Sequence, residues 1–360
     1  MASIEYLEWI MGRPDQATYD LGSSDLRRFD PSPGQVVPDV LADLPDPDDD
    51  VALRSQVAEI YGVDEDATLV AAGATHANFL THVATLLAGN ERGRALVERP
   101  GYEPLWRTPE TLGAEIDRFD QPAEEDYRLS PDRVAEAIEP ETGLVVISNR
   151  HNPSGRLADR ETLREVAEVV ADAGAVLLVD EVYAPYTADT ADVPFGGPTA
   201  AGLANTVISS SLTKFHGLGG LRIGWLVGDP DVLDPAWSAM GHVPVRAAPS
   251  VALARRALAN NEALARTARE RIRGNHALLA EFVDRRTDLS GPVFDGSTFA
   301  FLAHDSADGN RVVEAAEDRD LLVVPGRFFD DPERFRVSLG LDPAEMETAL
   351  DVLGETLDAC

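Results

Sequence analysis

Lysine is almost absent from this sequence, because only one of its 31 basic residues, Lys214, is a lysine and the others are arginines. Cysteine is as scarce, since Cys360 at the last position is the only one. One cysteine excludes an internal disulfide and any cysteine-rich metal site. No apolar stretch approaches the roughly 20 residues that a membrane-spanning helix requires. These absences argue against disulfide-stapled secreted proteins and helical membrane proteins.

A targeting pattern is also missing from the first residues, MASIEYLEWIMGRPDQ. They contain no basic segment followed by an apolar run, which a secretory signal peptide would have. No low-complexity tract and no repeat of fixed period interrupts the chain. We therefore expect a soluble, cytoplasmic, globular protein without a membrane partner.

Positive charge as a whole is scarce, since 63 acidic residues outnumber the 31 basic ones and the net charge is −32. Such a surface repels phosphates, which disfavours nucleic-acid binding. The acidic residues are spread along the chain, with the densest run at 46–50. This pattern favours a protein from a halophilic organism, in which high internal salt screens the repulsion. The alternative is an ordinary acidic protein encoded by GC-rich DNA, which also favours arginine over lysine.

The 360 residues, 44% of them apolar, are enough for two domains. In the middle of the chain, short apolar runs alternate with amphipathic segments, which is typical of an open, mostly parallel sheet with helices on both faces. The expected helices are 76–87, 131–138 and 160–173. The expected strands, which predict an α/β fold, are 68–72, 94–98, 115–119, 144–148, 176–180, 206–210 and 223–228.

The pattern changes near residue 250. A long arginine-rich helical segment at 250–285 precedes short strands at 298–302, 321–324 and 335–339 and a closing helix at 343–357. We therefore predict an N-terminal segment (1–50) that joins the small domain, a large domain (51–245) and a small α+β domain (246–360). Ligands of open parallel sheets bind at the carboxyl ends of the strands.

Lys214 follows one of these strands, TVISSS, and precedes three glycines within six residues. An amine in such a loop is partly desolvated, which favours the neutral form that attacks a carbonyl and makes a Schiff base. Ser209, Ser211 and Arg222 could together hold a phosphate through hydroxyl donors and a planar cation. From spacing alone, an ordinary surface loop with one basic residue is a slightly better interpretation of this segment than a Schiff-base lysine beside a phosphate site.

Three further segments carry weaker signals. Asn152 opens the turn NPSG after an apolar strand. Asp180 ends the strand VLLVD, three residues before Tyr183, and is either paired, functional or a cap. A strand also runs into the turn at 73–75 and then a helix, where free N–H groups and the helix dipole favour an anion.

Taken in this order and spacing, the four segments resemble the fold-type I pyridoxal-phosphate (PLP) enzymes, specifically the class I and II aminotransferases. The resemblance extends from about Gly22 to the C-terminus. Its most specific part is S-L-T-K followed by G-L-R-I-G. It implies a large PLP-binding domain with a mostly parallel seven-stranded sheet, and a smaller α+β domain.

The resemblance also implies roles for individual residues. Lys214 matches the Schiff-base lysine. Asp180 matches the partner of the cofactor's pyridinium nitrogen, whose negative charge keeps that nitrogen protonated so that the ring can act as an electron sink. Tyr183 and Asn152 match the pair that binds the phenolic oxygen, and Tyr102 matches the aromatic residue stacked on the ring. The residues that match the phosphate site are Gly73, Ala74, Thr75, Ser209, Ser211 and Arg222.

Arg336, in the stretch RFRVSLG, matches the arginine that holds the substrate's α-carboxylate. A bidentate ion pair there would hold the substrate with its breaking Cα–H bond perpendicular to the cofactor ring. Without the upstream segments, an ordinary arginine on a strand edge would be the better interpretation.

One departure from the family concerns a tyrosine that many members carry before the segment matching 51–54 and that reaches the partner subunit's phosphate. This sequence has ADLPDPDDD there, without a tyrosine. We interpret His151 as a loop residue. His216 either faces the phosphate or caps a turn, and His76 either lines the substrate cavity or lies on a helix surface.

The leading prediction is a PLP-dependent aminotransferase that moves an amino group from an L-amino acid to a 2-oxo acid with ping-pong kinetics, and is a homodimer by resemblance. One alternative is a decarboxylase or lyase of the same fold, because the run SLTKF also resembles the threonine-phosphate decarboxylases. Another is a PLP-binding module without turnover. The histidinol-phosphate branch is disfavoured because its asparagine-rich N-terminal motif is missing.

The substrate is left open by the sequence. Acidic substrates would need a second cation, for which the candidates are Arg27, Arg28, Arg107 and Arg327. An apolar pocket could instead be lined by Trp106, Phe328 and Phe329.

Overall fold

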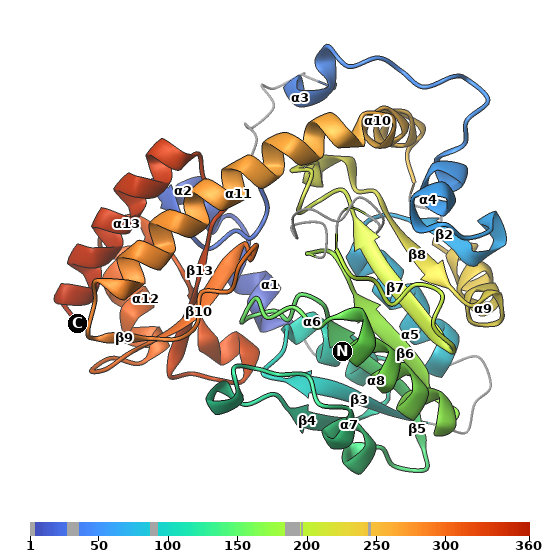
Figure 1. The fold of residues 1–360 in the computed structure, drawn as a ribbon, viewed down its shortest axis with the longest axis horizontal. Coiled ribbons are helices and arrows are strands. Elements are labelled where there is room, and N and C mark those ends of the chain that lie inside the picture. The colour runs from blue at the N-terminus through green and yellow to red at the C-terminus, as the bar shows by residue number, and fades with distance from the viewer. Residues whose placement is uncertain (1–3, 27–35, 87–92, 184–194, 196, 244–245) are drawn as a thin grey trace.

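The computed structural model describes residues 4–26, 36–86, 93–183, 195, 197–243 and 246–360. Figure 1 shows two bodies that are connected by the long helix α11 (Asn261–Asp284). The larger body contains the main sheet, and the smaller body contains the C-terminus.

The larger body is built on a seven-stranded sheet in the order β2-β8-β7-β6-β5-β3-β4. All neighbouring strands in it are parallel except β8, which runs antiparallel to β2 and β7. Parallel neighbours need long crossover connections, and the helices between the strands provide them. The strands are β2 (Thr68–Ala71), β3 (Arg94–Arg99), β4 (Glu115–Asp120), β5 (Thr142–Ser148), β6 (Val176–Asp180), β7 (Thr206–Ser211) and β8 (Gly224–Gly228).

Alternate strand residues face two separate hydrophobic layers, because successive side chains of a strand point to opposite faces. Val145 and Leu177 pack into one layer, and Leu144 and Leu178 pack into the other. The first layer is closed by α4 (Leu53–Tyr61), α7 (Pro131–Ala137), α8 (Arg160–Asp172) and α10 (Ala248–Ala259). The second layer is closed by α5 (Ala74–Leu86), α6 (Glu103–Thr111) and α9 (Pro230–Met240).

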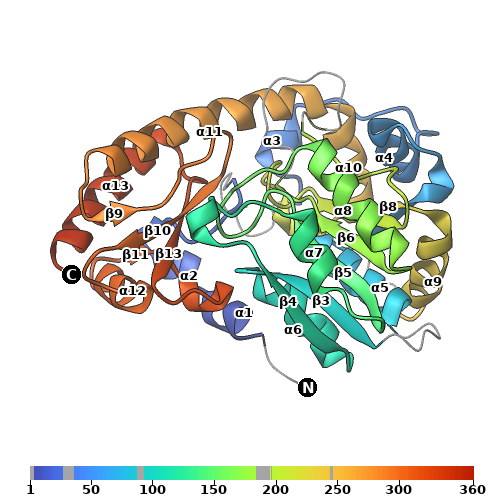
Figure 2. The ribbon, with the colours of Figure 1, turned by 60° about the horizontal axis from the view of Figure 1, so that its bottom comes forward.

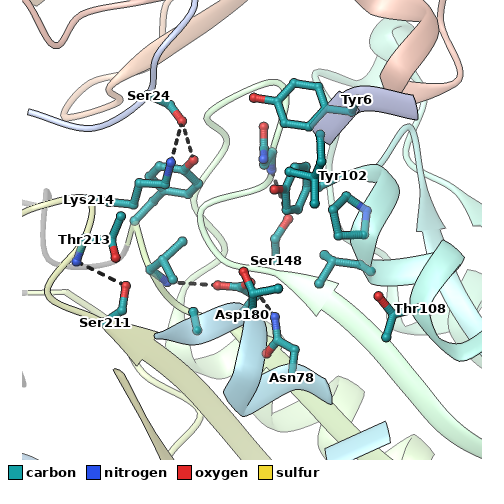
Figure 3. A pocket seen from close by; sticks show the side chains of 18 of the residues that line it. Tyr6, Ser24, Asn78, Tyr102, Thr108, Ser148, Asp180, Ser211, Thr213 and Lys214 are labelled. Atoms are coloured by element: carbon teal, nitrogen blue, oxygen red, sulfur yellow. Dashed lines mark hydrogen bonds between the residues drawn. The ribbon is translucent and has the colours of Figure 1, made fainter. Parts of the chain in front are cut away.

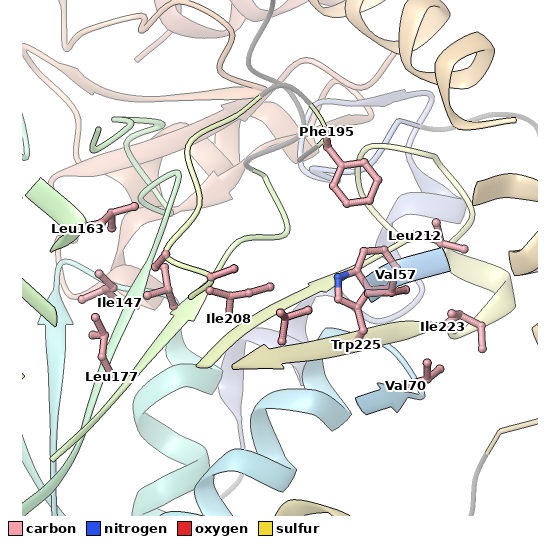
Figure 4. Close-up of a cluster of buried hydrophobic side chains, with 14 of the residues drawn as sticks. Val57, Val70, Ile147, Leu163, Leu177, Phe195, Ile208, Leu212, Ile223 and Trp225 are labelled. Carbon is pink, nitrogen blue, oxygen red and sulfur yellow. The ribbon is translucent and has the colours of Figure 1, made fainter. Parts of the chain in front are cut away.

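Trp225 of β8 packs into the first layer (Figure 4). Its side chain is fully buried and stacks on Phe195, with 5.9 Å between the ring centroids. Its indole N–H donates to the hydroxyl of Tyr61 over 3.3 Å, so the polar atom of this large side chain is also satisfied.

The smaller body is a four-stranded antiparallel sheet in the order β12-β13-β10-β9, which packs against α11 and two further helices. The N-terminal segment reaches this body, because Tyr19 and Asp20 pair in parallel with Leu321 and Leu322. The elements are β1 (Tyr19–Asp20), β9 (Leu289–Ser290), β10 (Phe299–His304), β11 (Leu321–Leu322), β12 (Val324–Pro325), β13 (Arg334–Ser338), α12 (Gly309–Glu317) and α13 (Pro343–Asp358).

Short helices complete the described chain. In the views of Figures 1 and 2, α1 lies between the two bodies, and in Figure 2 α7 and α8 lie over the near face of the main sheet. The remaining elements are α1 (Glu5–Ile10), α2 (Arg13–Gln16), α3 (Asp39–Ala42) and the 3-10 turns η1 (Glu65–Ala67), η2 (Ala123–Glu125), η5 (Gly219–Leu221) and η6 (Gly326–Phe329).

The predicted α/β fold with a mostly parallel seven-stranded sheet is confirmed. The long helix predicted at 250–285 is instead two helices, α10 and α11, because the backbone leaves the helical conformation at Asn260. The strand predicted at 321–324 is split into β11 and β12. The three-part domain boundaries stay a prediction. Within the described residues, no helix has both the length and the apolar character needed to cross a bilayer.

Candidate active site

A cavity of about 220 Å³ lies where β5, β6 and β7 end beside the N-terminus of α5 (Figure 3). This is the carboxyl edge of the parallel strands, where ligands of such sheets bind. The predicted site residues that line it are Ala74, Thr75, Tyr102, Asn152, Asp180, Tyr183, Ser211, Lys214, Arg222 and Arg336.

Lys214 projects into the cavity from the loop after β7. Its Nζ donates to the Oγ of Ser24 over 3.2 Å, and the same Oγ lies 2.7 Å from the hydroxyl of Tyr183. The N–H of Leu26 donates to the Lys214 carbonyl over 3.1 Å, so the N-terminal segment passes directly beside the lysine.

The protonation of Lys214 differs from the sequence expectation. Burial favours the neutral amine, but the acidic groups of Tyr183, Asp25 and Tyr6 outweigh burial and raise the pKa of Lys214 above its ordinary value. Desolvation therefore favours the neutral amine as expected, but the neighbouring acidic groups reverse its net effect on the pKa of Lys214. The amine must pass a proton on before it can act as a nucleophile, and it is hydrogen-bonded to Ser24, whose Oγ is in turn hydrogen-bonded to Tyr183.

Asp180 ends β6, is buried and lines the cavity, and lies below Lys214 in the view of Figure 3. Its carboxylate accepts hydrogen bonds from Asn78 Nδ2 (2.9 Å) and from the N–H of Val182 (3.2 Å). Burial raises the pKa of Asp180, and these two donors and the charge of Lys214 lower it only in part. A cation placed against this carboxylate would stabilise its ionised form.

The turn between β2 and α5 lies against Arg222 and offers hydrogen-bond donors suited to an anion. Gly73 has φ +86°, and a Cβ there would lie 3.1 Å from Arg222 Nη2, so glycine lets the guanidinium approach the main chain. Gly224 makes room from the other side, because a Cβ there would lie 2.8 Å from the nitrogen of Ala74. The first N–H groups of a helix have no partner within the helix. Those of α5, the Ser211 hydroxyl and Arg222 are therefore a donor set for a phosphate.

Arg336 on β13 is fully buried and reaches the cavity from the smaller body. Its Nη1 donates to Asn152 Oδ1 over 2.7 Å, and its Nη2 donates to the Gly22 carbonyl over 3.2 Å. Its Nε is buried without a hydrogen-bond partner in the described part of the chain. No described carboxylate forms an ion pair with this guanidinium, so it is a buried cation suited to an incoming carboxylate.

Tyr102 and Tyr6 form another wall of the cavity (Figure 3). Their rings meet edge to face, with 5.4 Å between the centroids. Glu103 on α6 accepts the N–H groups of Glu5 (3.1 Å) and Tyr6 (2.6 Å), which fixes the start of α1 over the cavity. The Tyr6 hydroxyl in turn accepts from Arg336 Nη2 over 3.4 Å.

Two predicted phosphate residues do not line the cavity. Gly73 lies directly behind it, against Arg222. Ser209 lies deeper in β7, paired with Asp180 and Leu226, and is fully buried. Ser211 faces the same side of the sheet one pair nearer the strand end, so it reaches the cavity where Ser209 does not.

The three histidines considered in the sequence analysis have structural partners. His151 lies 2.7 Å from Ser154 Oγ and 2.8 Å from the Pro100 carbonyl, which agrees with its interpretation as a loop residue. His216 lies 2.8 Å from Asn261 Oδ1 and does not line the cavity. The Nδ1 of His76 accepts the N–H of Ala72 over 3.1 Å, so this ring caps the turn before α5.

None of the described side-chain candidates for substrate selection lines the cavity. Arg107 pairs with Glu110 over 2.7 Å. Arg327 bonds Asn310 and lies over the ring of Phe328. Phe328 and Phe329 pack behind Tyr6, and Trp106 lies beneath the Arg107 guanidinium, 4.2 Å away. Arg27 and Arg28 are outside the described residues.

Several cavity residues escaped the sequence analysis. Asn78 follows Ala74 by one helical turn, so the predicted helix could have identified it. Ser148 is the last residue of β5, and a polar residue at the carboxyl end of a predicted parallel strand is also a candidate for the site. Tyr6 and Ser24 come from a segment without periodicity, and only the folded chain brings them to the cavity.

These residues fit PLP. An isolated buried carboxylate suits a protonated ring nitrogen, an amine suits an aldehyde, and the donor set at the start of α5 suits a phosphate. The glycine at 73 also leaves the space beside Arg222 that a Cβ would fill. The fit rests on the chemistry of these groups and on their shared cavity.

Comparisons with known proteins agree with this chemistry. The family model "Aminotransferase class I and II" matches residues 39–353. Capreomycidine synthase of Streptomyces vinaceus is 26% identical over 97% of this chain and 92% of its own length. Histidinol-phosphate aminotransferase of Sphingopyxis alaskensis is 30% identical, but the match covers only 59% of this chain and 55% of that protein.

Among solved structures, a PLP-dependent aminotransferase from Streptococcus suis superposes with a TM-score of 0.84. The match covers 99% of this chain and 98% of that chain at 21% identity, so it shows the fold. The family match spans most of the chain, including all the cavity elements except the N-terminal segment. The chain belongs to the class I and II aminotransferases, a family of PLP-dependent enzymes with fold type I.

Proposed function

We propose that this enzyme transfers the amino group of an L-amino acid to a 2-oxo acid, with both half-reactions in the described cavity. The observation that carries the proposal is Arg336, a fully buried guanidinium without a described carboxylate partner. It shares one cavity with Lys214 and Asp180. Amino acids and 2-oxo acids both bring the α-carboxylate that Arg336 lacks.

PLP, when bound, supplies an aldehyde and an electron sink. The residues of the chain do the rest. Lys214 provides the amine for the covalent link and later moves the proton at the substrate Cα. Ser24 and Tyr183 form the hydrogen-bonded route by which the protonated amine loses its proton. Asp180 holds positive charge on the ring nitrogen, and Arg336 orients the substrate by its carboxylate.

We further propose a neutral substrate side chain. Beyond Arg336, the described lining toward α1 and α6 consists of Tyr6, Leu7, Pro104, Leu105 and Thr108. This wall offers apolar surface and hydroxyl groups, and none of its described members is a cation that could pair with a second carboxylate. By family analogy the protein is a homodimer, which sedimentation of the purified protein would test.

A second candidate is a PLP enzyme that does not transfer the amino group. The relative that matches over almost the full chain carries the name of a synthase, whereas the histidinol-phosphate aminotransferase match covers about half. The same cavity residues would serve a decarboxylase or lyase, because the fold does not fix the reaction.

The test is to add single L-amino acids to the PLP-loaded protein at high salt and to analyse the products. Release of the matching 2-oxo acid, with loss of cofactor absorbance at its resting wavelength, is expected for neutral amino acids. Release of carbon dioxide would support the decarboxylase instead. A cyclised or eliminated product would support the lyase or synthase. A cofactor spectrum that responds to no amine would contradict all three and favour a binding module.

A further inference from the structure

A buried acid outside the set described so far lies behind the cavity. Glu98 is on β3, and its side chain is fully buried. One carboxylate oxygen, Oε1, accepts the N–H of Ser148 over 2.9 Å and also the Ser148 hydroxyl. The other oxygen, Oε2, accepts Nε2 of Gln121 over 2.9 Å.

Ser148 connects this acid to the active site. Its Oγ accepts the N–H of Asn152 over 2.9 Å while it donates to Glu98. Asn152 in turn accepts from Arg336 Nη1 over 2.7 Å. A continuous chain of hydrogen bonds therefore runs from Glu98 through Ser148 and Asn152 to the guanidinium of Arg336.

The directions of these hydrogen bonds match an ionised carboxylate. Three donors, two from Ser148 and one from Gln121, point at the two oxygens of Glu98. If Oε1 carried a proton, that proton would compete for Ser148 Oγ, and the Ser148 hydroxyl would lose its acceptor. The Asn152 N–H would then share its acceptor with a second donor, and its position would loosen.

We propose that Glu98 is a positioning residue for the reaction, which holds Asn152 against Arg336 through Ser148 and does so fully only when its carboxyl is ionised. The inference rests on the proposed role of Arg336 in binding the substrate carboxylate. Glu98 touches neither substrate nor cofactor, so its effect passes through Ser148.

Burial raises the pKa of Glu98 to about 8, and the hydrogen bonds from Ser148 and Gln121 and the charge of Arg118 offset part of that effect. The residue therefore changes charge within the working range of most enzymes. A second cavity of about 280 Å³, which Glu98 and Ser148 also line, gives the carboxyl a path for proton exchange. The other titratable groups around that cavity are Tyr127, Arg128, His151, Arg156 and Asp159.

The experiment measures the Kd of acetate for the PLP-loaded protein from pH 6 to pH 9.5 at one fixed salt concentration, followed by cofactor absorbance. Acetate carries only the group that Arg336 recognises, and the measurement needs no turnover. The variant Glu98→Gln keeps the shape and a neutral acceptor for Ser148, and Gln121 can rotate its amide to pair with it. The informative quantity is the Kd of the variant divided by that of the wild type.

We expect this ratio to be near one below pH 7 and to rise to about fivefold above pH 9, because a hydrogen bond to an ionised acceptor is about twice as strong as a neutral one. Ser148→Ala, which removes the acceptor of the Asn152 N–H at every pH, should raise the ratio across the whole range and most strongly above pH 9. The control Glu181→Gln changes a buried acid whose pKa is also raised to about 8 by burial but which bonds Thr199 and Ala200, and its ratio should stay flat.

A ratio for Glu98→Gln that is flat across this range, while acetate binds the wild type, would overturn the inference and leave the proposed function intact. An equal rise in the Glu181→Gln control would also overturn it, since any buried acid would then suffice. Failure of acetate to bind the wild type at any pH would overturn both proposals together.

Discussion

At the scale of the residue, the single lysine is explained by its chemistry. Arginine stays protonated at any working pH and is a poor nucleophile, whereas a lysine amine can lose its proton. Arginine serves at every other basic position, including Arg336 and Arg222, which line the same cavity. The lysine lies in the cavity, hydrogen-bonded to Ser24, where the proposed chemistry needs an amine.

The role of Arg336 is testable with a substitution that keeps its charge. Arg336→Lys should raise the KM for amino acids by about tenfold or more, because an ammonium cannot replace the paired N–H donors of the guanidinium. Steady-state kinetics with the substrate found in the product assay would measure this. Arg327→Lys, on a residue outside the cavity lining, should leave KM within about twofold of wild type. Equal KM values for both variants would contradict the assigned role.

At the scale of the element, one edge of the sheet gathers the site. The strands β5, β6 and β7 end at the cavity, the turn before α5 faces Arg222, and β8 begins two residues after Arg222. Gly224 of β8 lies against the Gly73–Ala74 main chain, so any side chain there would collide with the turn before α5. The layer around Trp225 holds β8 in this place (Figure 4).

Trp225→Ala should lower the free energy of unfolding by about 3–5 kcal/mol, since it removes a fully buried ring and leaves a cavity. Chemical denaturation at constant salt would measure the loss. The control Val243→Ala changes an exposed side chain three residues after α9 and should stay within about 0.5 kcal/mol of wild type. A loss below 1 kcal/mol for the tryptophan variant would mean that this layer does not hold the strand.

The sequence predicted the elements of the main sheet well, because buried parallel strands are continuous apolar runs that end in polar residues. Asp180, Lys214 and Asn152 stand at such ends, so their meeting in one cavity follows from the topology. The break at Asn260 was not predicted, because helical periodicity continues across it. Tyr6, Ser24 and the chain from Glu98 to Arg336 depend on contacts between residues far apart in the sequence, for which no local pattern exists.

At the scale of the whole molecule, the excess of acid is the dominant feature. The described ion pairs, such as Arg94 with Asp117 (2.7 Å) and Arg133 with Glu125, use arginines against a surplus of carboxylates. Partly exposed pairs of this kind contribute roughly 0–1 kcal/mol each, so they do not balance a net charge of −32. Repulsion among the remaining carboxylates destabilises the folded state unless salt screens it.

The midpoint of thermal unfolding should therefore rise by several degrees as KCl is raised from about 0.1 M to about 1 M, where the Debye length falls to about 3 Å. Differential scanning fluorimetry at pH 7 would follow the change. Screening weakens the ion pairs as well, but their number is too small to reverse the sign. A midpoint that falls with salt would contradict the halophilic interpretation of the composition.

The most direct test of the account is to locate the cofactor on the chain. The PLP-loaded protein is treated with borohydride, digested and analysed by mass spectrometry, with Lys214→Ala treated in parallel. Since the sequence has one lysine, its only other primary amine is the α-amino group. We predict a reduced pyridoxyl group on the peptide containing Lys214 and none in the variant. A label on the α-amino group alone, or no label in the loaded wild type, would contradict the account.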